Sequence, residues 1–125
     1  MKLTHGKILI LIGVGHTLAS LLPSFFLNQW REFSSAFFFN VSPHVLSGPL
    51  AVISFEKEAA FWFVSWGILL VFFGLALDHI EKSSGQVPKT LRVSWFIFSV
   101  LSSIMLPVSG FPILVLPQSI RMLVR

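Results

Sequence analysis

The sequence predicts an all-α membrane protein with four transmembrane helices and with both termini in the cytoplasm. Three observations lead to this fold class: the composition, four apolar stretches and the positions of the charged residues. Of the 125 residues, 54% are hydrophobic and 11% are charged, whereas a soluble domain carries about 25% charged residues. Lipid must therefore cover part of the apolar surface. The composition excludes a cytosolic enzyme and a disordered tail, and the absence of cysteine excludes a disulfide scaffold and a thiolate site.

The first expected span covers residues 8–27, a run of twenty residues without a charge. At about 1.5 Å per residue, such a helix crosses a hydrocarbon core of roughly 30 Å. The stretch also has features of a signal peptide, because Lys2 and Lys7 precede it and residues 17–19 offer a small-residue cleavage site. The apolar run continues past that site to Leu27, which favours an uncleaved anchor.

Residues 59–77 form the second expected span and residues 93–106 the third. The fourth, residues 111–124, has only 14 residues and would reach about 21 Å. Pro107 and Pro112 bracket the turn between the last two spans. Proline ends one helix but is tolerated in the first turn of the next, so a tight helical hairpin is expected here.

A long extracytoplasmic excursion is expected at residues 28–60. Its middle is uncharged and long enough to span, but Pro43, Gly48 and Pro49 interrupt a helix. With four spans, seven of the nine Lys and Arg residues lie on the cytoplasmic side, as the positive-inside rule requires. These seven are Lys2, Lys7, Lys82, Lys89, Arg92, Arg121 and Arg125. A single four-span domain is therefore expected over residues 1–125, with an excursion that lies on the membrane or dips into it.

His16 is the ionisable residue that lies deepest in an expected span, where such a group is costly and marks a functional candidate. Helical spacing places Gly13, Thr17 and Ser20 on the same face. In a functional interpretation, the imidazole transfers a proton or binds a ligand beside Ser20. The alternative, which we favour, is that the small residues let a neighbouring helix approach while the imidazole hydrogen-bonds across the interface.

A second candidate is the stripe of Glu58, Trp62, Ser65 and Trp66 at the start of the second span. In a functional interpretation, Glu58 is an acid or base at the mouth of a cavity, and Trp62 and Trp66 hold a planar or cationic group. The alternative, which we favour, is an interfacial glutamate beside tryptophans that prefer the headgroup zone.

Asn40 and His44 lie in the excursion, close to Pro43. If this segment dips into the membrane, both side chains face a cavity and join the candidates above. If it lies flat, it is a cover without chemistry, and the two alternatives stay open. The candidate catalytic residues are His16, His44 and Glu58, and the candidate ligand-binding residues are Trp62, Trp66, Asn40 and Ser20.

The charged run from Asp78 to Lys82 contains two carboxylates and one histidine. A metal site normally needs three or four convergent ligands, so His5 would have to join them from the start of the chain. A solvated turn is favoured, and no metal or cofactor is expected. The basic residues behind the net charge of +4 are dispersed at the span ends, which indicates contacts with anionic lipid rather than with nucleic acid.

Two motifs carry a resemblance to a known family: P-x-S-G-F at residues 107–111 and G-x-x-H at residues 13–16. They resemble a family of small bacterial four-helix integral membrane proteins of unknown function. The resemblance covers most of the chain apart from the excursion, and it implies a multi-pass fold in the bacterial inner membrane. It draws attention, without assigning roles, to His16, Trp62, Trp66, Ser109, Gly110 and Pro117.

Three functions are compatible with this sequence. The one we favour is a helix-bundle interaction or structural membrane protein that has a pocket for a lipophilic ligand. The second is a cofactor-free isomerase- or cyclase-type enzyme that uses His16, His44 or Glu58 for proton transfer on a lipophilic substrate. The third is a small transporter or channel with His16 as a proton-sensitive site. Membrane lipids, a lipophilic small molecule and a second copy of the chain are the expected partners.

Overall fold

The computed structural model describes residues 3–35 and 55–124, and all regular elements in these ranges are helical. The elements are α1 (His5–Ala19), α2 (Leu27–Ser35), α3 (Phe55–Ser84), α4 (Lys89–Met105), the short π-helix η1 (Phe111–Val115) and α5 (Leu116–Val124). The all-α fold class is confirmed.

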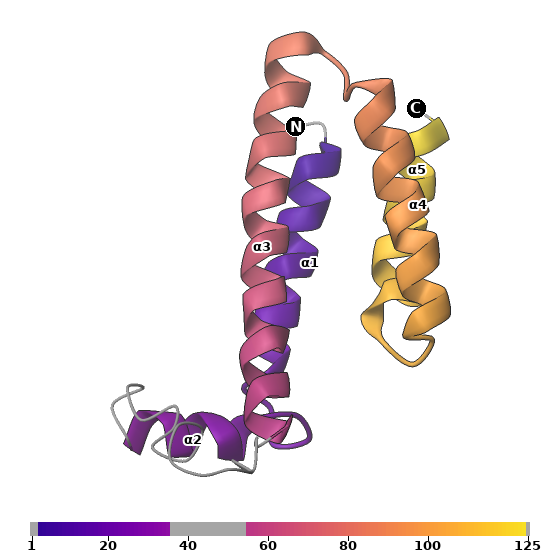
Figure 1. Ribbon diagram of the computed structural model, residues 1–125. Helices are drawn as coiled ribbons and strands as arrows, with labels where there is room; N and C mark the ends of the chain where they lie inside the picture. Colours follow the sequence, from indigo (N-terminus) through magenta and orange to yellow (C-terminus); the bar gives the residue numbers. More distant parts are fainter. Residues whose placement is uncertain (1–2, 36–54, 125) are drawn as a thin grey trace, which may run out of the picture. The chain divides into compact units, whose positions relative to one another are not determined.

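The chain divides into two compact units. One unit combines the described residues of Met1–Gly13 and Leu69–Arg125, and the other consists of the described residues of Val14–Ile68. α1 and α3 each contribute residues to both units. Within each unit the two helices run beside one another (Figure 1).

α3 is the longest helix, and it contains the whole of the expected span at residues 59–77. Its segment Glu58–Ser84 has 27 residues and is the one described helix that is long and apolar enough to cross a membrane. At about 1.5 Å per residue this segment is about 40 Å long, which exceeds the roughly 30 Å of a hydrocarbon core.

The first helix is shorter than the expected span at residues 8–27, because α1 ends at Ala19 after 15 residues. Two i to i−3 hydrogen bonds tighten the chain there: Ser20 N donates to Thr17 O at 3.2 Å, and Leu21 N donates to Leu18 O at 3.1 Å. Pro23 then follows within the turn, where its missing N–H cannot continue a helical ladder. The described helices therefore do not by their length support four spans.

α4 ends where the sequence predicts a turn. Leu106 N donates to Ser102 O at 2.9 Å, and Ser109 Oγ donates to Leu106 O at 2.6 Å. The same hydroxyl accepts a bond from Phe111 N at 3.2 Å, so one serine side chain closes the turn on both sides. Pro112 lies in the first turn of η1, where no hydrogen bond is lost.

The turn folds η1 and α5 back against α4, and α4 and α5 lie side by side in Figure 1. A buried hydrogen bond joins the two helices, donated by Trp95 Nε1 to Gln118 Oε1 at 2.8 Å. Beside it, the buried Ser99 hydroxyl donates to Trp95 O at 2.7 Å, within α4 itself. The ring of Phe73 contacts Trp95 at 4.8 Å between centroids, so the second half of α3 packs on the same tryptophan.

The backbones of α1 and α3 approach one another closely at two buried glycines, Gly6 and Gly74. A Cβ added to Gly74 would lie 2.8 Å from Gly6 O and 2.8 Å from Ile10 N. A Cβ added to Gly6 would collide with the backbone of Gly74 and Asp78. Both positions therefore need glycine because backbone, rather than a flexible side chain, occupies the space.

We expect Gly6→Ala to separate the two helices and to lower the free energy of unfolding by roughly 1–3 kcal/mol, the usual range for overpacking. Gly15→Ala is the matched control in the same helix, because a Cβ at Gly15 meets nothing within 4 Å. It should leave stability unchanged or raise it by up to about 1 kcal/mol through helix propensity. Unfolding in mixed micelles measures both variants, and equal destabilisation would contradict the close approach.

Candidate functional site

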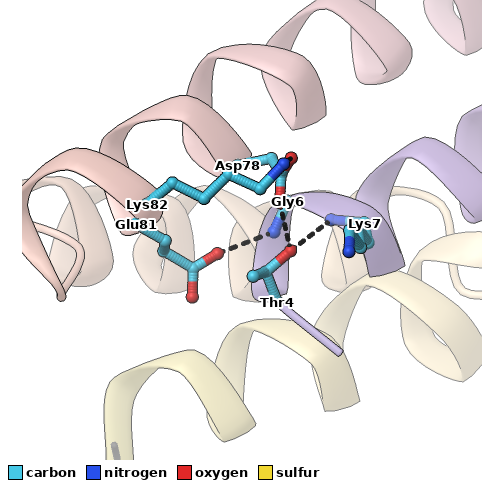
Figure 2. A network of polar contacts seen from close by, with 6 residues as sticks. All are labelled: Thr4, Gly6, Lys7, Asp78, Glu81 and Lys82. Atoms are coloured by element: carbon cyan, nitrogen blue, oxygen red, sulfur yellow. Dashed lines mark hydrogen bonds and ion pairs between the residues drawn. The ribbon is translucent and has the colours of Figure 1, made fainter. Parts of the chain in front are cut away.

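A polar network joins the start of α1 to the end of α3, beyond the apolar part of α3 (Figure 2). Thr4 precedes α1, and its hydroxyl oxygen accepts a hydrogen bond from Lys7 N at 3.2 Å, which is the geometry of a helix N-cap. The same hydroxyl donates to Asp78 Oδ1 at 2.5 Å. Thr4 therefore caps its own helix and binds the neighbouring one.

Glu81 completes the cap from the other helix. Its Oε2 accepts a hydrogen bond from Gly6 N at 3.0 Å, one of the N–H groups that have no partner within α1. A carboxylate is stabilised at this position, because the N-terminus of a helix carries partial positive charge. The glycine at position 6 lets α3 come close enough for this bond to form.

Asp78 also pairs with Lys82, whose Nζ lies 2.5 Å from Asp78 Oδ2 one turn along α3. The hydrogen bond from Lys82, and then the hydrogen bond from Thr4, hold the pKa of the Asp78 carboxyl below its ordinary value. Asp78 is therefore charged at neutral pH, and both of its oxygens are engaged.

A half-open cavity of about 470 Å³ adjoins this network. Its polar lining includes His5, Glu81 and Arg92, and Val87 and Met122 provide apolar wall. The turn between α3 and α4 builds one side of the cavity, because Gly85 has a φ of 77°, a left-handed conformation that glycine adopts without strain. The chain then buries Val87 and starts α4 so that Arg92, in its first turn, reaches the cavity.

Arg92 differs in its hydrogen bonding from Glu81, the acidic residue of the cavity lining. Its Nε is buried and has no hydrogen-bond partner among the described residues, whereas Glu81 is bound to α1. No group of three His, Cys, Asp or Glu side chains in residues 3–35 and 55–124 is arranged to hold a metal ion. Arg92 therefore offers a guanidinium donor to the cavity.

His16 lies in the other unit, where its ring stacks on Phe63 of α3 at 3.8 Å between centroids and 17° between planes. Phe25 and Phe26 contact the same phenylalanine, at 5.8 and 5.3 Å. Nε2 of His16 is buried and has no hydrogen-bond partner within the described part of the chain. The histidine is thus part of an aromatic cluster. The ring that covers it belongs to Phe63, which lies outside the stripe of Glu58, Trp62, Ser65 and Trp66 that the sequence predicted as a candidate site.

The other described site candidates differ in exposure. Glu58 and Trp62 are exposed and Trp66 is half-buried, while the buried Ser20 hydroxyl, in the turn that follows α1, donates to Thr17 O at 2.7 Å. Asn40 and His44 lie outside the described residues.

The sequence predicted neither the Thr4–Asp78 contact nor the Arg92 cavity. It led us to expect Asp78 and Glu81 in a solvated turn. That interpretation is wrong for both carboxylates, because each bonds to α1. One signal was present in the sequence: Thr4 stands directly before an apolar helix, at a suitable spacing for an N-cap.

We expect Asp78→Asn to remove the acid-sensitive part of the stability of this network. Because the pKa of Asp78 is lowered in the folded protein, its contribution is present above the ordinary aspartate pKa of about 3.9 and is lost as the pH falls below it. Asp78→Asn should therefore lower the thermal midpoint at pH 7 and match the wild type near pH 2. Glu58→Gln, which removes an exposed carboxylate from the same helix, should keep the wild-type pH dependence. An unchanged gap between Asp78→Asn and wild type across this pH range would contradict the assignment.

Comparison with known proteins gives a family but no activity. No curated protein and no solved structure matches the chain. The sequence profile of a family of unknown function (DUF6463) matches residues 1–125, so the chain belongs to this family.

Proposed function

We propose that the protein is a multi-pass membrane protein of the bacterial inner membrane, with α3 as its central span and with a structural or interaction role. The observation that carries this proposal is the exposed apolar face of α3. Large side chains on that face remain uncovered by protein, namely Phe61, Trp62, Ile68, Leu69, Phe72 and Leu75.

These exposed residues follow the helical repeat. At 3.6 residues per turn, they occupy an arc of about 140° on one side of α3. The buried residues Ala60, Leu70 and Leu77 lie on the opposite side, together with Gly67 and Gly74. A helix that is apolar on both sides is typical of a membrane span or of the core of a large protein, and the described residues leave one of these sides of α3 exposed. Lipid acyl chains are the cover that fits.

The remaining helices complete the proposed topology. The α4–α5 hairpin exposes Ile97, Leu101, Ile104 and Ile113, an apolar surface that also suits lipid. α1 carries Leu11, Val14 and Leu18 exposed in the same way. We place four crossings in the membrane, with both termini in the cytoplasm, because this arrangement follows the positive-inside rule.

The packing of the polar residues favours a structural or interaction role over catalysis. Gly6 and Gly74 bring two helices together, and the Trp95–Gln118 hydrogen bond joins two others. Small residues at close approaches and polar side chains that bond across helices are the usual means of association in lipid. Membrane lipids are the proposed partners of the outward faces.

Single cysteines test the span, because the chain contains no native cysteine. In membranes, Phe72→Cys should react with a water-soluble maleimide at least roughly tenfold more slowly than His79→Cys, since lipid excludes the reagent and suppresses the thiolate. His79 is exposed at the charged end of α3, so its cysteine should react from the cytoplasmic side, in inside-out vesicles but not in intact cells. Both should react fully in SDS. Fast labelling of Phe72→Cys in intact membranes would contradict the proposal.

A further inference from the structure

We infer that the cavity between the start of α1 and the α3–α4 turn is a binding site for a phosphate group, with Arg92 as its principal ligand. This inference goes beyond the proposed function. Nothing in the phosphate chemistry requires that α3 spans a membrane, and only the lipid source of the phosphate rests on that proposal.

The size of the cavity is the first argument. At about 470 Å³, it is far larger than the roughly 30 Å³ of one water molecule, and it lies in the ordinary range of small-molecule sites, about 300–1,000 Å³. The space is sufficient for a glycerol phosphate unit.

The state of Arg92 is the second argument. A buried N–H donor without an acceptor costs free energy, and Nε of Arg92 is such a donor among the described residues. The planar guanidinium offers paired N–H groups that match the oxygens of a phosphate. A phosphate in the cavity would give this guanidinium an acceptor and the opposite charge.

The acidic residue in the wall does not oppose this assignment. Glu81 Oε2 is held by Gly6 N, and the partial positive charge at the start of α1 offsets its carboxylate. The nearby Asp78 is engaged by Thr4 and Lys82. Arg92 therefore differs from Glu81 in the cavity lining, because the described residues provide its side chain with neither a hydrogen bond nor an ion pair.

The apolar wall and the position of the cavity indicate the source of the phosphate. Leu3, Val87 and Met122 line the cavity beside the polar groups, and such a wall suits glycerol and the first methylenes of an acyl chain. The cavity lies just past the end of the apolar part of α3, which in the proposed topology is the level of the cytoplasmic headgroups. A phospholipid headgroup fits this position, and a free phosphate ester shares its chemistry.

The test uses the full-length protein in a neutral maltoside detergent and measures the thermal midpoint with increasing ligand. The probes are dihexanoyl phosphatidylglycerol, glycerol phosphate, and dihexanoylglycerol as the uncharged lipid control. We expect saturable stabilisation by phosphatidylglycerol and none by dihexanoylglycerol. Stabilisation by glycerol phosphate as well would support a site for phosphate esters in general, whereas stabilisation by the lipid alone would support a headgroup site.

Variants show whether Arg92 is responsible. Arg92→Gln should weaken phosphatidylglycerol binding by roughly tenfold or more, through the loss of a charge-assisted donor pair. Arg92→Lys, which keeps the charge and is the safer variant for folding, should weaken it to a smaller extent because the planar fork is lost. Arg31→Gln removes the same side chain from an exposed position of α2 and should bind as the wild type does.

Three outcomes would overturn the inference. They are no stabilisation by either phosphate probe, unchanged affinity in both Arg92 variants, and equal weakening in Arg31→Gln, which would indicate general electrostatic attraction. Because the assay contains no bilayer, these outcomes do not depend on the cysteine-labelling result for α3. The two experiments can therefore fail independently. Labelling can support the α3 span while the phosphate probes do not bind, or the probes can bind while labelling contradicts the span.

Discussion

The contact between the backbones of α1 and α3 at Gly6 and Gly74 is the constraint on which the polar end of the structure depends. With no Cβ at either position, the two helices approach until a carboxylate of α3 reaches an N–H group in the first turn of α1. The bond from Thr4 to Asp78 needs the same approach. A larger residue at position 6 would push α1 outward and weaken both bonds together, so the two glycines and the two carboxylates form one unit of stability.

In the α4–α5 hairpin, other residues likewise hold two helices together through a polar bond. There the turn at Ser109 brings α5 back, and the buried pair of Trp95 and Gln118 aligns the two helices. In surroundings of low dielectric constant, an unpaired indole N–H would be costly, so this pair selects one arrangement of the hairpin. Phe73 packs on Trp95, and through this contact the helix that binds α1 also supports the hairpin. Among the described residues, the bonds from Thr4 to Asp78, from Gly6 to Glu81 and from Trp95 to Gln118 thus join different helices.

Local patterns predict the parts of this fold that local physics determines. The apolar run at residues 59–77 predicts α3, because a backbone that lacks water must satisfy its own hydrogen bonds, and Pro107 and Pro112 predict the break before η1. Apolar length alone failed at residues 20–27, where i to i−3 bonds and Pro23 end α1 although the residues stay uncharged. The pairing of α1 with α3 in the polar network could not be read from the sequence, since Thr4 and Asp78 are 74 positions apart and charged residues at a helix end look the same whether solvated or paired.

The contrast between His16 and Arg92 shows why an ionisable residue in an apolar stretch is an incomplete guide to function. His16 satisfies the sequence criterion, yet its ring stacks on Phe63 beside Phe25 and Phe26, and an imidazole can be packed in its neutral form at modest cost. Arg92 stands at the margin of an apolar helix, where a sequence pattern assigns it to topology. A guanidinium cannot lose its charge to suit its surroundings, so a buried Nε without an acceptor beside an open cavity is a stronger indication of a ligand than a buried histidine in an aromatic cluster. The residue that the sequence pattern assigns to topology is therefore the one to which we assign the phosphate site.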